Sequence, residues 1–509
     1  MRTVLPSVDV RAPGRREPLP YALLAVGGGI LLGGLVLAYQ LRSTTATELA
    51  IAGVMIGLAC VIVGNPRRCL LAALLLDIPL EWGKYLLWNQ AAGKVGAIAG
   101  LNISVTTIAL AGLFTLWMFD RPSAAPRLRL RAALPLIVYL GVNAASLLVA
   151  QDKTLGMYNL ALLAQLLLMF IYVVSTVRTR EDIRFVVAVL LAGLLAESAL
   201  ILLIYVAGPN MSFLGLRNRV SPADYGGRVG GTVGSPNGAA AYLCLLLPLA
   251  ISVLVSNANR QLRRLATAAL PLGVLALVVT GSRGGWASFA ISTAIIGVWM
   301  VRRGLILART AVLAAVFVAV LSVPLWGTVA QRVGGNDNGA AASRLPLMKL
   351  AGEMVSAHPL LGVGVNNVGI DIPQYAGPEF DGQFLYTVHN KYLLVWAEAG
   401  IGALLAFVWF LVATLRRGWR TGRARDPTLS PLAVGLSAGI AGQIAHMGVD
   451  VFNGKPEVEG LWLAAGLLAA MEMILRRERA LQRLPRRGWR AARDFVSTHT
   501  EPLTAGSTR

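Results

Sequence analysis

Residues 391–414 read KYLLVWAEAGIGALLAFVWFLVAT, and this stretch decides the fold class. As an α-helix it would be about 36 Å long, at about 1.5 Å per residue. The hydrocarbon core of a bilayer is about 30 Å thick, so a run of this length can cross it. Lys391 and Glu398 are its charged residues. The stretch therefore predicts a transmembrane helix.

Similar apolar runs recur along the chain of 509 residues. Some are shorter than a full crossing and fit re-entrant or half-buried segments. The pattern predicts an all-α, polytopic bundle of 12 to 14 transmembrane helices. The runs lie at about 21–40, 48–64, 69–88, 102–119, 132–150, 154–176, 185–207, 238–256, 265–281, 286–301, 310–326, 391–414, 431–449 and 459–475.

The composition agrees with a bilayer protein. Hydrophobic residues make up 56% of the chain and charged residues 14%, whereas soluble proteins average about 45 to 50% and about 25%. The net charge is +21, from 46 basic and 25 acidic residues. These basic residues fall in short clusters between apolar runs, so membrane topology explains them and no nucleic-acid partner is implied. The lipid bilayer is the first expected partner.

Alternate connections between the runs carry the basic clusters. The Lys and Arg bias of short loops predicts that these connections and both termini are cytoplasmic. We therefore expect a cytoplasmic tail at 1–20, a membrane domain at 21–475 and a basic cytoplasmic tail at 476–509. The basic connections are 67–68, 121–131, 178–184, 260–264, 302–309, 416–425 and the tail from 476 onward.

Two of the expected outer connections are long, at about 208–237 and 327–390. The second predicts a loop subdomain with short helices. Ser343 can cap a helix and Pro346 fits its first turn. An apolar stripe follows on one face, which would let this helix lie on the membrane surface. The stripe consists of Leu347, Leu350, Ala351 and Met354.

Arginines in the outer loops are informative because membrane topology disfavours them there. Several guanidinium groups on one face indicate an anionic ligand, since the planar fork of arginine matches phosphate oxygens. The alternative is that each arginine reaches lipid phosphates or pairs with a loop acid such as Asp224. The arginines concerned are Arg217, Arg219, Arg228, Arg283 and Arg344.

His389 stands at the outer start of the run at 391–414. An imidazole with an ordinary pKa near 6.5 can accept a proton from a hydroxyl, although a histidine at a helix start is more often a cap or interfacial residue. His446 and Asp450 are one helical turn apart and could pair, with a structural role favoured. Glu197 and Glu398 are costly in hydrocarbon and should face the bundle interior.

Other kinds of site are not indicated. Cys60, Cys69 and Cys244 lie in or beside apolar runs without CxxC spacing, so neither a disulfide framework nor a zinc site is predicted. The chain has no HExxH motif, no D-x-D pattern in the outer loops and no nucleotide-binding glycine motif. No metal and no cofactor are expected.

Four motifs in order carry a resemblance to a known family. They are GTVGSPNGAAAYLCLLLPLA at 231–250, VVTGSRGGWASFAIS at 278–292, SRLPLMKLAGEMVSAHPLLGVGVNN at 343–367 and VHNKYLLVWAEAGIGAL at 388–404. Together they resemble the O-antigen ligase and O-antigen polymerase superfamily. These are bacterial inner-membrane glycosyltransferases of the GT-C type, which transfer glycans from an undecaprenyl-diphosphate carrier on the periplasmic face without a metal.

The resemblance implies roles for particular residues. Arg283 and Arg344 match the family arginines expected to bind the lipid diphosphate, and His389 matches the family histidine. An arginine that precedes the PN segment (residues 236–237) is also expected to bind the donor, and Arg217 or Arg219 is favoured over Arg228 for this role. His389 would be the base that activates an acceptor hydroxyl, and attack opposite the diphosphate would invert the anomeric centre. Family members have about 12 spans, against up to 14 apolar runs here.

Three alternatives remain at this point. A ligase would move a finished chain onto lipid A core, whereas a polymerase would join carrier-linked glycan repeats, and the motifs do not separate them. A transporter of a lipid-linked or anionic substrate would also be basic and polytopic, but transporters often carry repeated halves and no repeat is visible here. A non-catalytic scaffold would leave the outer arginines unexplained.

Overall fold

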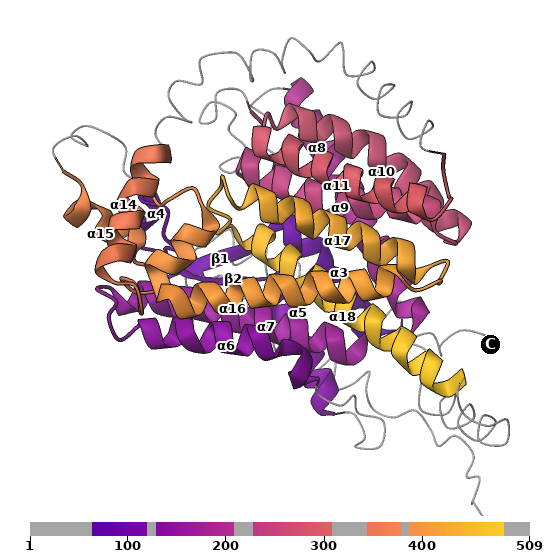
Figure 1. Ribbon diagram of the computed structural model, residues 1–509, viewed down its shortest axis with the longest axis horizontal. Coiled ribbons are helices and arrows are strands. Elements are labelled where there is room, and N and C mark those ends of the chain that lie inside the picture. The colour runs from indigo at the N-terminus through magenta and orange to yellow at the C-terminus, as the bar shows by residue number, and fades with distance from the viewer. Residues whose placement is uncertain (1–63, 120–128, 208–227, 308–343, 378–385, 483–509) are drawn as a thin grey trace, which may run out of the picture.

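The computed structural model describes residues 64–119, 129–207, 228–307, 344–377 and 386–482 (Figure 1). Within these ranges it contains fourteen α-helices and one two-stranded sheet. The predicted all-α, polytopic fold class is confirmed. The runs at 21–40 and 310–326, nearly all of 48–64 and the N-terminal tail lie outside the described residues, so the total of 12 to 14 spans stays a prediction.

Seven of the described helices are long and apolar enough to cross a membrane. Two further bundle helices are shorter or less apolar, namely α6 (Leu130–Ser146) and α17 (Leu429–His446). The seven are α7 (Lys153–Thr176), α8 (Arg180–Ala207), α9 (Pro236–Val255), α10 (Arg260–Val279), α11 (Arg283–Arg302), α16 (Lys391–Gly422) and α18 (Lys455–Gln482).

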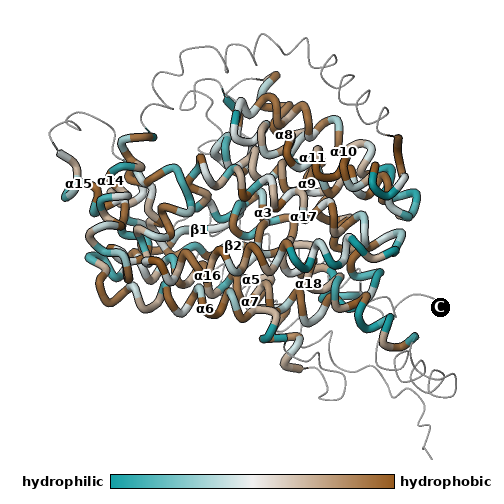
Figure 2. Tube along the Cα trace, in the orientation of Figure 1, coloured by the Kyte–Doolittle hydropathy of each residue, from teal (hydrophilic) through white to brown (hydrophobic). Residues whose placement is uncertain are grey.

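Burial separates central from peripheral helices. The most apolar 18-residue windows of α9 and α18 are each 83% buried, whereas that of α11 is 22% buried. Large side chains such as Phe170, Phe410 and Trp462 fill the space between the helices. Hydrophobic residues run along the helices, and hydrophilic ones lie near α14 and α15 and at the end of α18 (Figure 2). The outer helices thus present apolar faces that suit lipid.

The apolar run at 69–88 differs from a continuous helix. Helix α3 (Pro66–Leu80) ends at Glu81, whose φ of 45° is left-handed. The Asp77 carboxylate accepts hydrogen bonds from the backbone N–H groups of Trp82 and Thr106, each at 2.8 Å. A hairpin follows, in which β1 (Gly83–Leu86) pairs antiparallel with β2 (Leu101–Ser104), with Gly83 opposite Ser104. Helix α4 (Gln90–Lys94) lies between the two strands, and the apolar helix α5 (Val105–Met118) follows β2 and packs against α3.

The basic connections meet at one end of the bundle. Arg180 pairs with Asp426 at 2.5 Å and with Glu478 at 2.8 Å. Arg68 pairs with Glu181 at 2.8 Å. These contacts join the starts of α3 and α8, the α16–α17 connection and the end of α18. Connections that the charge pattern assigned to one side of the membrane therefore lie together in space.

The described part of the loop at 327–390 forms a small subdomain at the other end (Figure 1). Helix α14 (Arg344–Ala357) buries the predicted apolar stripe together with Val355, and α15 (Val368–Tyr375) packs beside it. Their core also includes Val388 and Leu394, from the segment that leads into α16. The expected helix is confirmed, but its apolar stripe packs against α15 and the start of α16, so the expectation that this face lies on the membrane surface is wrong. Ser343, its expected cap, lies outside the described residues.

The subdomain is joined to α16 by backbone hydrogen bonds. Gly400, with φ of 77° and ψ of 179°, interrupts α16. The N–H groups of Val363 and Gly364 donate to the carbonyls of Ala397 and Glu398, at 2.8 and 2.9 Å. A Cβ on Gly400 would lie 1.8 Å from the Leu360 carbonyl oxygen, so no larger residue fits there. The loop thus satisfies carbonyls that the break in the helix frees.

Candidate functional site

His389 lies in the short segment before α16. The next residue, Asn390, is the N-cap of α16, and its side chain accepts hydrogen bonds from two backbone N–H groups of the first turn, at 3.1 and 3.0 Å. The Thr387 N–H donates to the Val95 carbonyl at 3.0 Å. The ring centroids of Tyr386 and His389 are 5.6 Å apart. His389 is therefore held between the helix cap and the hairpin insertion.

The surroundings of His389 keep its imidazole neutral. Burial is the largest cause that lowers its pKa below the usual value near 6.5, and the nearby positive charge of Arg344 lowers it further. The Asp450 carboxylate acts in the opposite direction. Among the described residues the buried Nδ1 of His389 has no hydrogen-bond partner. A neutral imidazole in this position can accept a proton near neutral pH.

The pair of His446 and Asp450 lies beside His389. His446 ends α17, and its Nε2 is 3.5 Å from Asp450 Oδ2, so the pairing expected from their spacing is present. His446 is 2% exposed, and its Nδ1 has no partner in the part of the chain that the structure describes. The Arg344 charge acts on His446 as well as on His389. Two imidazoles, one carboxylate and one guanidinium thus share a site.

Arg283 is the first residue of α11, and this end of α11 lies close to His446. Ser282 caps this helix by accepting a hydrogen bond from Gly285 N–H. A Cβ on Gly284 would lie 2.5 Å from His446 Cδ2 and 2.7 Å from its Nε2. Only a glycine permits this approach of α11 to His446. The start of α11, with Arg283, is therefore packed against the end of α17.

Of the three arginines that precede Pro236 and Asn237, the structure describes one. Arg228 donates to the Thr280 carbonyl at 2.8 Å and to Asn237 Oδ1 at 2.6 Å, so it braces the turn that leads to Arg283. Arg217 and Arg219, the favoured diphosphate ligands, lie outside the described residues. The structure therefore shows the Arg344 charge acting on His389 and His446, and packs Gly284, the neighbour of Arg283, against His446.

A cluster of charged residues next to this site, at the starts of α16 and α18, was not predicted from the sequence. Lys391 donates through Nζ to Asn453. Glu457 accepts a hydrogen bond from Gly454 N–H at 2.9 Å, and Lys455 pairs with Glu459 at 3.6 Å. Electrostatic interactions link Glu457 to both Asp450 and Lys391. The signal was available in the sequence, because KPEVE places three charges at the start of an apolar helix, where they are expensive.

The two buried glutamates predicted to face inward do so. Glu197 is 3% exposed and accepts hydrogen bonds from Thr232 N–H and Oγ1, at 2.8 and 2.5 Å. It thereby holds the short 3₁₀ turn η3 (Gly231–Val233), rather than a neighbouring helix. Glu398 is 6% exposed. Among the described residues no group of three or more His, Cys, Asp or Glu is arranged to hold a metal.

Residues 266–408 match the family model described as O-antigen ligase. This segment is therefore similar to the O-antigen ligase family. It contains Arg283, Arg344 and His389, whereas His446 and Asp450 lie beyond its end. No curated protein matches the chain. The matched segment thus contains the histidine and both described arginines, whereas His446 ends α17 and Asp450 lies in the connection that follows it.

Proposed function

We propose that this protein is a membrane glycosyltransferase that moves a glycan from an undecaprenyl-diphosphate carrier to a sugar hydroxyl. The observation that carries this proposal is the packing of the start of α11, which begins with Arg283, against His446, whose Nε2 lies 3.5 Å from Asp450 Oδ2. The charge of Arg344 acts on both His389 and His446. A fixed cation beside a neutral imidazole suits a reaction in which a phosphate leaves and a hydroxyl loses its proton. The O-antigen ligase segment supports the same class of activity.

Arg344 and Arg283 would bind the diphosphate of the donor. As the bond from the anomeric carbon to the diphosphate oxygen breaks, negative charge develops on the phosphate oxygens, and preorganised arginines stabilise it. The arginines supply the positive charge that a divalent cation provides in other transferases, so the proposed reaction is independent of metal. Arg217 or Arg219 would add a further contact to the donor.

His389 would act as the general base. The acceptor hydroxyl oxygen attacks the anomeric carbon, the bond to the diphosphate breaks, and the hydroxyl proton passes to the imidazole. Asp450 would stabilise the imidazolium that forms, because its carboxylate already favours the charged form of His389. Attack opposite the leaving diphosphate inverts the anomeric centre, and linkage analysis by NMR of donor and product would detect retention instead.

The proposed location follows from the separation of charge along the bundle. The basic connections meet at one end, and the site around His389 lies at the other. Because basic loops favour the cytoplasmic side, we propose that both termini are cytoplasmic and that the site faces the periplasmic or external side of the bacterial inner membrane.

The test is a transfer assay with the purified full-length chain in lipid nanodiscs. Carrier-linked repeat units are supplied with and without lipid A core. Laddered products without core indicate a polymerase, and transfer that requires core indicates a ligase. His389→Ala is expected to lower either product about 10²- to 10⁴-fold, the usual contribution of a general base.

His358→Ala is the matched control, because His358 is an exposed histidine of the same subdomain. It should retain transfer. If His389→Ala inserted normally and were as active as the wild type, His389 would not be the general base. Flux of the lipid-linked glycan across the membrane without transfer would favour the transporter alternative.

A further inference from the structure

The end of α16 remote from His389 carries two adjoining hollows that the proposed reaction does not use. Helix α16 has 32 residues, so this end lies roughly 45 Å from the start of the helix, at about 1.5 Å per residue. One hollow, of about 460 Å³, lies between α16 and α18. The other, of about 580 Å³, also includes the start of α6. Both lie among the basic connections of the bundle.

Arginines dominate the lining of both hollows. The first is lined by four and the second by five, of which Arg420 and Arg476 are common to both, so seven arginines contribute. Glu472 is the acidic residue that lines each of them. The full set of arginines is Arg129, Arg131, Arg417, Arg420, Arg423, Arg476 and Arg479.

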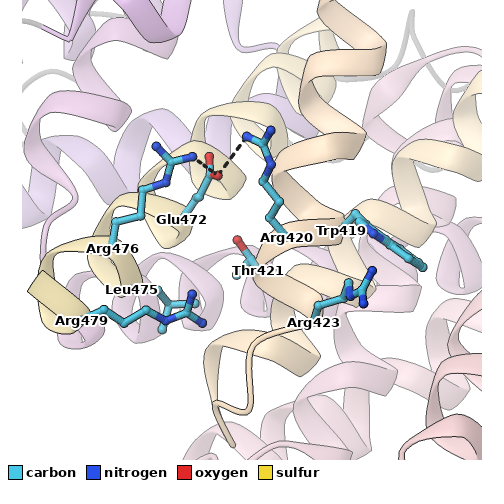
Figure 3. Close-up of a pocket in the computed structure, with 8 residues that line it drawn as sticks. All are labelled: Trp419, Arg420, Thr421, Arg423, Glu472, Leu475, Arg476 and Arg479. Carbon is cyan, nitrogen blue, oxygen red and sulfur yellow. Dashed lines mark hydrogen bonds and ion pairs between the residues drawn. The ribbon is translucent and has the colours of Figure 1, made fainter.

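Glu472 organises the wall between the hollows rather than neutralising it. It accepts a hydrogen bond from Arg476 Nη2 at 2.7 Å and lies 3.5 Å from Arg420 Nη1. Figure 3 shows Arg420 and Arg476 reaching it from α16 and α18. The side chains of these two arginines remain 61% and 64% exposed. One carboxylate against seven guanidinium groups leaves a large excess of positive charge.

Apolar side chains line the same two hollows as the arginines. Trp419 and Leu475 line the first hollow, and Leu130 and Met473 line the second. Arg423 lies over the Trp419 ring, with Cζ 5.6 Å from its centroid. Tryptophan beside arginine at the end of an apolar helix is typical of the membrane interface. An occupant of these hollows would therefore meet guanidinium groups and apolar surface together.

We propose that this arginine groove, lined by the ends of α16 and α18 and the start of α6, binds the headgroup of an anionic phospholipid. Phosphate oxygens would accept hydrogen bonds from the guanidinium groups in both hollows, and the acyl chains would lie along Trp419 and Leu130. Basic pockets between transmembrane helices bind phosphate-bearing headgroups in this way. The site is separate from the one around His389 and does not depend on its proposed reaction.

The chain offers an internal comparison. A third basic hollow, of about 620 Å³, is close in size to the second and is lined by Arg260, Arg263 and Arg264. Its described lining residues come from α10 and the turn before it, and they include neither an aromatic nor a leucine side chain. Arg260 and Arg264 therefore provide surface charge of the same kind without the apolar component or the second helix.

The test measures lipid retained by the purified full-length chain, using native mass spectrometry with dioleoyl phosphatidylglycerol, dioleoyl phosphatidylcholine or inorganic phosphate as the probe. Arg131→Gln combined with Arg479→Gln removes one arginine from each hollow and leaves the Glu472 bridge intact. Each arginine near an anionic headgroup contributes about fivefold in affinity, so the pair should weaken phosphatidylglycerol binding about 25-fold. Arg260→Gln combined with Arg264→Gln should change it by less than about twofold, because neither residue lines the groove and exposed charges at a distance are screened.

Equal losses in the two double variants would overturn the proposal, because surface charge alone would then explain the binding. Retention of phosphatidylcholine as strong as that of phosphatidylglycerol would also overturn it. If inorganic phosphate alone showed the same dependence on Arg131 and Arg479, the groove would bind a phosphate anion and not a lipid. Thermal unfolding of each variant, followed by intrinsic tryptophan fluorescence, identifies any variant that fails to fold.

Discussion

The two ends of α16 hold charged side chains in opposite ways. At its start the charges are of both signs and partly or fully buried, and electrostatic interactions link His389 to Asp450 and Lys391 to Glu457. At its far end they are exposed and almost all positive. Buried mixed charge is expensive and needs accurate positions, whereas exposed arginines tolerate movement. This difference is consistent with the two proposals, a reaction at the first end and binding of a headgroup at the second.

Among the predictions that test this difference between the two ends, substitution of Arg344 should have the largest effect. Arg344→Gln should lower glycan transfer about 10²- to 10³-fold, the usual effect of losing one preorganised donor to a developing anion. Arg344→Lys should recover part of the activity, because it restores the charge without the planar fork. Rates of transfer at saturating donor measure both effects.

Two controls separate this effect from general loss of charge. Lys349→Gln removes an exposed charge from the same helix, α14, and Arg260→Gln combined with Arg264→Gln removes two charges from the basic end. Each should leave transfer within about twofold, as expected of exposed surface charges. A comparable loss in either control would show that the two ends do not differ as proposed.

A smaller effect is expected where α11 meets His446. Gly284→Ala would place a Cβ 2.5 Å from His446 Cδ2, so the imidazole must move. We expect transfer to fall about 10- to 100-fold, since displacement of a site by about 1 Å has effects of this size. The midpoint of thermal unfolding should also fall, because overpacking costs about 1 to 3 kcal/mol.

Gly297→Ala is the matched control on the same helix, because no atom lies within 4 Å of the added Cβ. Alanine there should raise helix stability by up to about 1 kcal/mol and leave transfer unchanged. If both substitutions behaved alike, the close approach of α11 to His446 would have no functional consequence.

The smallest expected effect is a shift in pH dependence. Transfer should decline as the pH falls through the pKa of His389, which lies below 6.5, because the imidazolium cannot accept a proton. Asp450→Asn removes the carboxylate that raises this pKa, so the inflection should move to lower pH. Any activity left in Arg344→Gln should show an inflection at higher pH, because a charge that lowers the pKa is gone.

Profiles of transfer rate against pH, at saturating donor and acceptor, measure these shifts. Movement of the two inflections in the same direction would contradict the proposed electrostatics of His389. An unchanged inflection in Asp450→Asn would show that Asp450 has a structural role with His446 alone.

Local sequence patterns predicted much of the fold and part of the site. Periodicity located α14 and its buried stripe, and the spacing of His446 and Asp450 predicted their contact. These features depend on residues within one or two helical turns. Charge clusters also predicted which connections meet, because the positive-inside rule acts on each connection independently.

Features that depend on distant segments could not be predicted. The turn that follows α3 is joined to α5 by Asp77, which accepts a hydrogen bond from Thr106 N–H, 29 residues away. The approach of α11 to His446 depends on how two helices pack, and no local pattern at Gly284 reveals it. The arginine groove likewise combines three helices, whose arginines appear in the sequence only as separate basic clusters.

The break in α16 at Gly400 has a consequence for biogenesis. During synthesis, residues 344–367 emerge from the ribosome before α16 exists, so they cannot dock when they are made. Once α16 has inserted, the carbonyls of Ala397 and Glu398 lack partners until Val363 and Gly364 reach them. Because unpaired carbonyls are costly in a membrane, docking completes the span. Assembly of the site is thereby delayed until the helix that carries His389 at its start is in place.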